Sequence, residues 1–331
     1  MPTAPADYQT RYPIDFGDID PAVRQHVVQL YAADGGKARA IVYRPPHGNP
    51  RTVILMAHPR ADFAQHYTIP YWVEAGFAAC ALNTRYLNND MMMLHENLLL
   101  DLAAAIRFLR EEEGFEQVVM LGNSGGGSLF AYYDAQARAP HGQRVGAPPG
   151  GGPPDLNRFE LPPADGLILL AAHPGQGMVL MGSIDAAVTD EHNPFANDPE
   201  LDMYDERNGY RTPPAPSRYA RQWLERYRAA QYARVARLDA IARGYAAEAQ
   251  QARAASGLPD FAEAPAAHRA LIRRHAMSPR IMLIYRTQAN PNYLDLSLDP
   301  SERAVGSIFS PRPDLFNYHA FGLAHVVTPE A

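Results

Sequence analysis

The chain has 331 residues, of which 47% are hydrophobic, and its formal net charge is -6. This length can bury a large core, either as one domain with an insertion or as two domains. The small negative charge leaves no basic surface for nucleic acid, so we expect no nucleic-acid partner. No apolar run is long enough to cross a bilayer and residues 1–10 lack a signal-peptide pattern, so we expect a cytoplasmic protein without membrane contact.

Two residue types that occur once limit the chemistry. Cys80 is the single cysteine, which excludes an intrachain disulfide and a cysteine-rich zinc site. It lies in the apolar run 76–82, which favours a buried core residue over a reactive thiol. Lys37 is the single lysine, so a Schiff-base enzyme or a Ser-Lys pair is disfavoured. No metal-ligand spacing stands out, and we expect neither a metal nor a cofactor.

Strand-like and helix-like stretches alternate through the first half of the chain. Apolar runs predict strands, and helical spacing predicts helices, in the following places: strands at 40–43, 52–56, 77–82, 117–121 and 166–172, and helices at 69–75, 97–111 and 127–138. Alternation of this kind is typical of a parallel sheet covered by helices. The predicted fold class is therefore α/β.

The second half of the chain has a different pattern. After a Pro- and Gly-rich surface excursion at 139–164, one long helix is predicted from Ser217 as N-cap to Gly257 as stop, with its arginines on a solvated face. A further strand is predicted at 280–285. We therefore divide the chain into three parts: a core at 1–175, a mostly helical cap or lid insertion at 176–279, and a return towards the core at 280–331.

The strongest motif is Gly122-Asn123-Ser124-Gly125-Gly126, which directly follows a predicted strand and precedes a predicted helix. A strand, a sharp turn and a helix are the setting of a nucleophile elbow, in which the glycines leave room for the turn. A dinucleotide-binding turn needs glycine at position 124, and a phosphate loop needs a Gly-Lys-Ser/Thr sequence after it. We interpret Ser124 as a nucleophile; the alternative is a Gly-rich turn required only for packing.

A second motif, His58-Pro59-Arg60, follows the predicted strand 52–56. An acyl-transfer site needs two N–H donors for the oxyanion. Gly125, the residue after the nucleophile, would supply one. Pro59 has no N–H, so Arg60 is the expected second donor. His58 is expected to line the pocket, as is His173, because the latter follows the core strand 166–172 at the same edge of the sheet.

On these two motifs the chain resembles the α/β-hydrolase superfamily, whose members often carry His-Gly where this chain has His58-Pro59. The resemblance covers residues 40–175. It implies an α/β-hydrolase-type, mostly parallel sheet flanked by helices, with a helical cap insertion, and a serine esterase activity. Residues 83–90 and 95–97 are similar to a looser group of uncharacterised bacterial hydrolases, which indicates no substrate.

A serine nucleophile needs a histidine to take its proton and a carboxylate to orient that histidine. In this superfamily the acid and then the histidine follow the serine along the chain. That order permits Asp299 with His325. No terminal helix follows His325, however, and the looser resemblance implies an acid and a histidine beyond residue 331. We therefore expect a chain truncated at its C-terminus, and the pair of Asp299 and His325 stays the alternative.

The predicted function is hydrolysis of an ester or a related acyl bond in a small-molecule substrate through a Ser124 acyl-enzyme. A thioester or amide substrate is an alternative within the same class of enzymes. A protein of this fold that binds a ligand without catalysis is an alternative outside it. The sequence indicates no oligomeric state.

Overall fold

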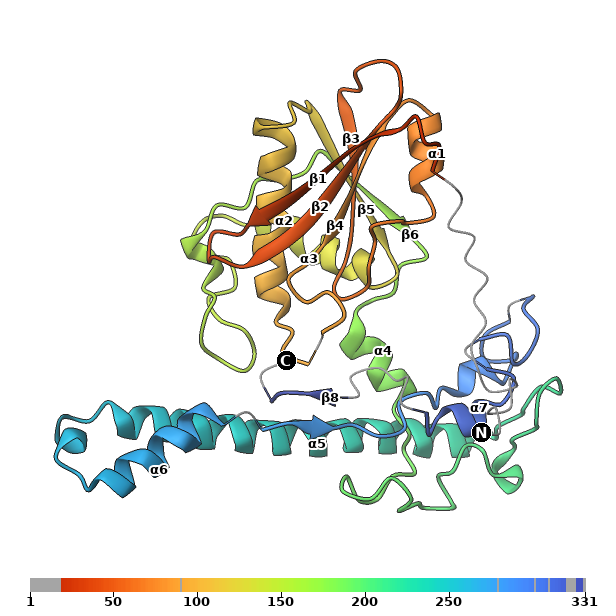
Figure 1. Ribbon diagram of the computed structural model, residues 1–331. Coiled ribbons are helices and arrows are strands. Elements are labelled where there is room, and N and C mark those ends of the chain that lie inside the picture. The colour runs from red at the N-terminus through yellow and green to blue at the C-terminus, as the bar shows by residue number, and fades with distance from the viewer. Residues whose placement is uncertain are drawn as a thin grey trace, which may run out of the picture. The chain divides into compact units, whose positions relative to one another are not determined.

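The computed structural model describes residues 19–89, 91–278, 280–300, 302–308, 310–319 and 326–329. The chain divides into two compact units, which we call the sheet unit (residues 19–176) and the helical unit (residues 177–329) (Figure 1). No helix in these residue ranges is both long and apolar enough to cross a membrane.

The sheet unit contains six strands in the order β1-β2-β4-β3-β5-β6 (Figure 1). Their bounds are β1 Arg24–Tyr31, β2 Lys37–Arg44, β3 Thr52–His58, β4 Ala78–Asn83, β5 Gln117–Asn123 and β6 Gly166–Leu170. β1, β2 and β4 pair antiparallel, whereas β4, β3, β5 and β6 pair parallel. The carboxyl ends of four strands therefore meet at one edge of the sheet.

Helices cover both faces of this sheet. They are α1 Ile69–Glu74, α2 His95–Glu111 and α3 Gly125–Arg138, with a short 3-10 helix, η2, at Leu156–Arg158. In β3 the alternate residues Val53 and Leu55 pack in the core that contains α2 and α3, and Ile54 packs in the core that contains α1. A strand buried on both faces has a continuous apolar sequence. The predicted α/β fold, a mainly parallel sheet flanked by helices, is confirmed.

β6 is one of the two edge strands of the six-stranded sheet, and it is shorter and less buried than the predicted strand at 166–172. It ends at Leu170, and burial alternates along it. Leu167 and Leu169 are 38% and 58% exposed. An apolar run predicts burial on both faces, but at the edge of the sheet these two leucines stay partly exposed.

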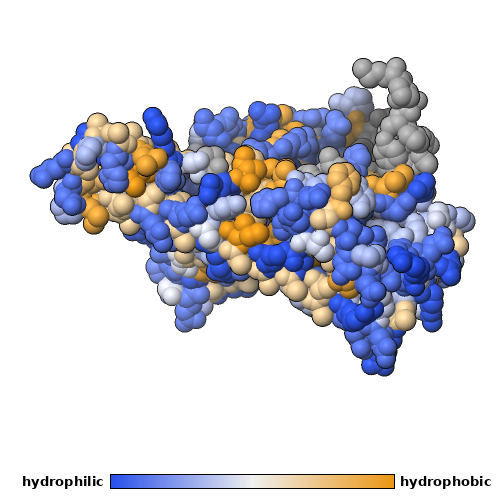
Figure 2. Space-filling model, turned by 90° about the horizontal axis from the view of Figure 1, so that it is seen from below, coloured by the Kyte–Doolittle hydropathy of each residue, from blue (hydrophilic) through white to orange (hydrophobic). Residues whose placement is uncertain are grey.

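The helical unit is built on α5 Arg221–Ser256, and α6 Ala266–Met277 lies alongside it (Figure 1). Its other elements are short: α4 Gln176–Ser183, η3 Glu206–Asn208, η4 Pro259–Ala262, η5 Pro291–Tyr293, α7 Pro313–Phe316, β7 Met282–Leu283 and β8 Val326–Val327. Figure 2 shows a mainly hydrophilic surface on which hydrophobic residues occur singly or in small groups. Such scattered apolar residues are normal for a folded surface.

The long helix begins later than predicted and ends where predicted. Gly257 is the C-cap, but the N-cap is Ala220 and the first helical residue is Arg221. The hydroxyl of Ser217 instead accepts the backbone N–H of Arg211 at 2.9 Å, so it stabilises the preceding loop and does not cap the helix.

Aromatic residues anchor the start of α5. The rings of Tyr219 and Trp223 stack with centroids 5.0 Å apart, and those of Trp223 and Tyr227 are 4.7 Å apart. All three are buried, as is Leu238 further along the helix. One stripe of α5 therefore faces the core of the helical unit, as the helical spacing predicts.

The strand predicted at 280–285 is reduced to Met282–Leu283, which pairs antiparallel with Val326–Val327 in a separate two-stranded sheet. The following backbone is bonded elsewhere. The carbonyl of Tyr285 accepts from the guanidinium of Arg234 at 2.8 Å, and the carbonyl of Arg286 accepts from the N–H of Asp185 at 2.8 Å. These hydrogen bonds take the place of the strand-to-strand bonds expected for a longer strand. No described residue beyond 279 joins the six-stranded sheet.

Candidate active site

Ser124 occupies a sharp bend between β5 and α3. Its φ is +53° and its ψ is -123°, and it is the N-cap of α3. This region of backbone conformation is sparsely populated for a residue with a side chain, and such residues cluster at functional sites. The predicted sequence of strand, bend and helix is confirmed, and the half-buried Ser124 lies neither within a helix nor in packed core.

Two glycines make the bend sterically feasible. A Cβ on Gly122 would lie 2.5 Å from the Cα of Gly127, and a Cβ on Gly126 would lie 2.3 Å from the carbonyl oxygen of Ala57. Both neighbours are backbone atoms, which cannot move aside as a flexible side chain can. The close approach of α3 to β3 therefore requires glycine at position 126.

The Gly125 amide is the first N–H of α3, so it has no acceptor within the helix. None of the described residues accepts this N–H, and none bonds to the Ser124 hydroxyl. A free N–H at a helix N-terminus attracts negative charge. The Ser124 hydroxyl and the Gly125 amide are therefore both available to a ligand at the carboxyl edge of the sheet.

The loop after β3 is fixed to the end of β4. The hydroxyl of Thr84 donates to the carbonyl of Pro59 at 2.8 Å. The side-chain oxygen of Asn83 accepts from the amide of Phe63 at 2.8 Å, and the amide of Asn88 donates to the carbonyl of Arg60 at 2.8 Å. Residues in the stretch 83–89 thus hold the His58-Pro59-Arg60 loop in place.

Arg60 differs from its predicted role. Its backbone N–H, which was expected to face the oxyanion, donates to Nδ1 of His58 at 3.2 Å. The N–H of Ala61 donates to the same nitrogen at 3.0 Å. The loop therefore folds back on the His58 ring, and the amide that the sequence analysis selected is already engaged. The sequence His58-Pro59-Arg60 does not indicate the hydrogen bond from the Arg60 amide to the His58 ring.

His58 and His173, both predicted to line the pocket, lie close to Gly125. Their Nε2 atoms are 2.9 Å and 3.3 Å from the point that a Cβ on Gly125 would occupy. The backbone N–H of His173 also donates to the carbonyl of Ser124 at 3.3 Å, which ties the loop after β6 to the bend. The structure thus brings both histidines to the turn around Ser124.

His66 is a third histidine at this edge, and no sequence motif indicates it. It is buried, and its Nε2 lies 3.3 Å from the side-chain oxygen of Asn123, the residue before Ser124. Its ring also packs against Phe63, with centroids 4.6 Å apart. It lies in a loop without a recognisable motif, so only the tertiary structure reveals it.

Burial keeps these three imidazoles neutral. Desolvation lowers the pKa of His58 from its ordinary 6.5 to about 4, and the charge of nearby Arg60 acts in the same direction. Burial likewise lowers the pKa of His66 and of His173. The edge of the sheet around Ser124 therefore carries uncharged histidines at neutral pH.

We expect the sheet unit to lose stability as the pH falls from about 6.5 towards 4. A folded-state pKa below the unfolded value means that the unfolded chain binds more protons, so the stabilisation present above 6.5 is lost across that window. Urea unfolding of a Trp223→Phe variant, followed through the fluorescence of Trp72, measures it. In His58→Gln the free energy of unfolding should change less with pH than in the wild type. The control variant His47→Gln, at an exposed position, should keep the wild-type pH dependence. An equally steep dependence in His58→Gln would contradict the assignment.

The structure does not test the proposed partners of Ser124. Asp299 lies in the helical unit, where its carboxylate is 3.3 Å from the guanidinium of Arg303. His325 lies outside the described residues. Asp299 and His325 therefore stay predictions.

The arginines of α5 do not form only a solvated face. Arg234 is fully buried, and its guanidinium is 2.9 Å from the buried carboxylate of Glu191. It also donates to the carbonyl of Asp185 at 2.8 Å. A second buried pair joins Arg286 and Asp185 at 2.7 Å. These charges hold the segments around α5 together, and helical spacing alone did not indicate their burial.

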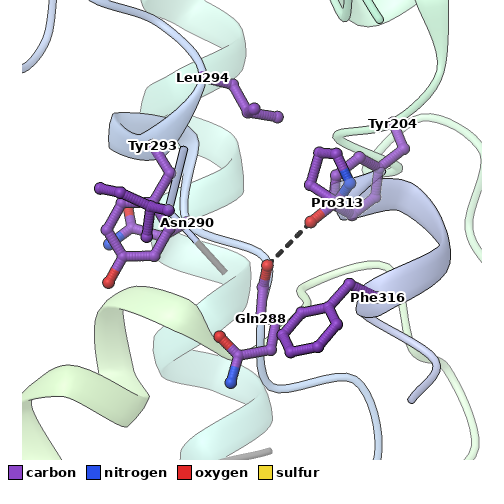
Figure 3. Close-up of a pocket in the computed structure, with 8 residues that line it drawn as sticks. Tyr204, Gln288, Asn290, Tyr293, Leu294, Pro313 and Phe316 are labelled. Atoms are coloured by element: carbon purple, nitrogen blue, oxygen red, sulfur yellow. Dashed lines mark hydrogen bonds between the residues drawn. The ribbon is translucent and has the colours of Figure 1, made fainter. Parts of the chain in front are cut away.

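The helical unit also contains a small cavity, in which the Tyr204 hydroxyl donates to the backbone carbonyl of Gln288 at 2.8 Å (Figure 3). Its volume of about 10 Å³ is room for a single water molecule. The residues that line it are Tyr204, Gln288, Asn290, Tyr293, Leu294, Ile308, Pro313 and Phe316. It is too small for an acyl substrate.

Two other chemistries find no support in the described residues. No group of three or more His, Cys, Asp or Glu side chains in them could hold a metal ion. Cys80 is fully buried, as predicted, and burial raises the pKa of its thiol, which opposes a nucleophilic role.

No protein-family model matches the chain. No curated protein matches it either. Solved structures resemble parts of it. A hypothetical protein from Pseudomonas aeruginosa is 15% identical over 55% of this chain and 53% of its own, with a TM-score of 0.37. Brefeldin A esterase, a bacterial homologue of human hormone-sensitive lipase, is 19% identical over 38% of each chain, with a TM-score of 0.31. A Pyrococcus furiosus esterase is 16% identical over 40% of this chain and 53% of its own, with a TM-score of 0.31.

Proposed function

We propose that this protein is a serine hydrolase of the α/β-hydrolase type, which cleaves an ester or a related acyl bond with Ser124 as nucleophile. The observation that carries the proposal is the conformation of Ser124, with a φ of +53° between β5 and α3. The glycines at positions 122 and 126 permit this conformation, and packing alone gives no reason for a strained serine there.

In the proposed reaction the Ser124 oxygen forms a bond to the acyl carbon while its proton passes to a base. The electrons of the carbonyl double bond move onto the carbonyl oxygen, which the Gly125 amide would stabilise. The bond to the alcohol then breaks, and the leaving oxygen takes the proton from the base. Water repeats these steps on the acyl-enzyme and releases the acid.

The base is the part of this mechanism that the three described histidines near Ser124 do not supply. Nδ1 of His58, of His66 and of His173 each accepts a backbone N–H, so the basic nitrogen of each ring is engaged. This observation favours a second candidate function, that of a binding protein which keeps the turn but catalyses no hydrolysis.

Hydrolysis of short-chain 4-nitrophenyl esters by the full-length protein separates the two candidates. For the hydrolase we expect turnover that Ser124→Ala lowers by at least about 10³-fold, since loss of a catalytic serine removes the covalent route. Ser256→Ala is the control, because this exposed hydroxyl bonds only to its own helix. If the chain is instead a binding protein, neither the wild type nor Ser124→Ala nor Ser256→Ala should show turnover.

His325→Ala tests the two sources of the base named in the sequence analysis. A comparable loss of turnover in this variant would assign the base to His325, and Asp299→Asn should then lower turnover as well. Unchanged turnover in His325→Ala would exclude that pair and assign the base to a group outside it.

A further inference from the structure

A His-Pro pair occurs on each side of the nucleophile strand. His58-Pro59 ends β3 and His173-Pro174 follows β6, and these strands are the two neighbours of β5 in the sheet. As a result, Nε2 of His58 and Nε2 of His173 both lie within 3.3 Å of one point above the Cα of Gly125. Two imidazoles from separate loops thus converge over the Cα of Gly125.

Hydrogen bonds fix the tautomer of both rings. Nδ1 of His58 accepts from the backbone amides of Arg60 and Ala61 at 3.2 Å and 3.0 Å. Nδ1 of His173 accepts from the amide of Gly175 at 3.1 Å. A backbone N–H only donates, so each Nδ1 carries a lone pair and the proton of the neutral ring is on Nε2. In both rings the nitrogen that lies near Gly125 therefore carries the proton.

His66 shows the same pattern with a different outcome. Its Nδ1 accepts from the amide of Thr68 at 3.3 Å, which again places the proton on Nε2. That proton is directed at the side-chain oxygen of Asn123, 3.3 Å away. No described residue accepts the Nε2–H of His58 or of His173. Only these two rings therefore keep an N–H available for a ligand.

We propose that the Nε2–H groups of His58 and His173, together with the Gly125 amide, bind the oxygen of the substrate carbonyl as it becomes negatively charged. The proposal rests on the proposed function and replaces the Arg60 amide as the second donor. The imidazoles keep their protons throughout. They act as fixed donors, and the loops that hold Nδ1 orient them before the substrate arrives.

The proposal excludes a base role for either ring. A base would need its lone pair directed at the Ser124 hydroxyl, but the lone pair of each ring is directed at the amides of its own loop. Neutrality also fits the role, because burial lowers the pKa of both rings and so keeps them uncharged at neutral pH.

The rate at which an alkyl fluorophosphonate labels the full-length protein tests the proposal, because the attacked phosphoryl oxygen also gains negative charge. His58→Leu and His173→Leu should each slow labelling by about 10²-fold, the cost of one lost donor. The Gln variants keep an N–H close to the position of Nε2 and should slow it by less than about tenfold. His47→Gln, at an exposed site, should label at the wild-type rate. Wild-type rates in both Leu variants would overturn the inference and leave the proposed function intact.

A second measurement does not depend on reaction at Ser124. Long-range ¹H–¹⁵N correlation spectra at pH 7, assigned with the His58→Gln and His173→Gln variants, report the tautomer of each ring. We expect both rings neutral with the proton on Nε2. A proton on Nδ1, or a charged ring, at either position would overturn the inference even if labelling occurs. A wild-type protein that is not labelled at all would instead contradict the proposed function.

Discussion

Gly126→Ala should slow fluorophosphonate labelling of Ser124 by at least about 10²-fold, because a misplacement of about 1 Å at a reacting group costs that much. The new Cβ would lie 2.3 Å from the carbonyl oxygen of Ala57. No side-chain rotation relieves this overlap, so the start of α3 must move away from β3 and take the bend at Ser124 with it. The added strain should also lower the free energy of unfolding by about 1–3 kcal/mol.

Gly146→Ala is the matched control in the same unit. A Cβ there would have its nearest neighbour at 3.9 Å, which is ordinary contact, and the backbone of Gly146 does not require glycine. It should label at the wild-type rate and keep the wild-type unfolding midpoint. If Gly126→Ala labelled as fast as Gly146→Ala, the close approach of α3 to β3 would not be what positions Ser124.

Glu191→Leu should destabilise the helical unit by about 3–5 kcal/mol, the cost of leaving a buried charge without its partner. The Glu191 carboxylate neutralises Arg234, whose side chain is 1% exposed. Leucine fills much of the space that the glutamate side chain occupies. The loss of stability therefore comes from the unpaired guanidinium of Arg234 more than from a cavity. The contact of Glu191 with Arg237 is lost as well, but that arginine is 41% exposed and can reach water.

Each unit contains one of the two tryptophans, so its unfolding can be followed separately. Urea unfolding of a Trp72→Phe variant, observed through Trp223, measures the effect of Glu191→Leu. Asp239→Ala breaks an exposed pair with Arg243 on the same helix and should cause no measurable change. Equal midpoints for the two variants would show that the Arg234 pair does not stabilise the unit.

The sequence predicted the inner strands well because they are buried on both faces. The apolar run at 52–56 corresponds to β3, and the single cysteine is in the core. β1, at Arg24–Tyr31, was not predicted. Most of its residues are exposed, and apolar and polar residues alternate only weakly along it. Its pairing with β2, which no hydrophobic pattern indicates, makes this segment a strand. The apolar run at 280–285 predicted a longer strand than the structure has, because the buried guanidinium of Arg234 bonds to the carbonyl of Tyr285.

The site could be predicted only where local sequence determines local conformation. The turn around Ser124 depends on its own glycines, and the sequence contained that signal. The bond from the Arg60 amide to His58 depends on the fold of a loop, and the approach of His58 to His173 depends on the order of strands in the sheet. Neither follows from spacing along the chain. The buried charge of Arg234 was missed for the same reason, since its partner is 43 residues away.

The most direct test is to identify the residue that a fluorophosphonate modifies in the full-length protein. The reaction joins phosphorus to a nucleophilic oxygen and releases fluoride, and peptide mass spectrometry then locates the adduct. We expect one adduct, on Ser124, and none in Ser124→Ala. An adduct on any other residue, or no adduct in the wild-type protein, would contradict the account.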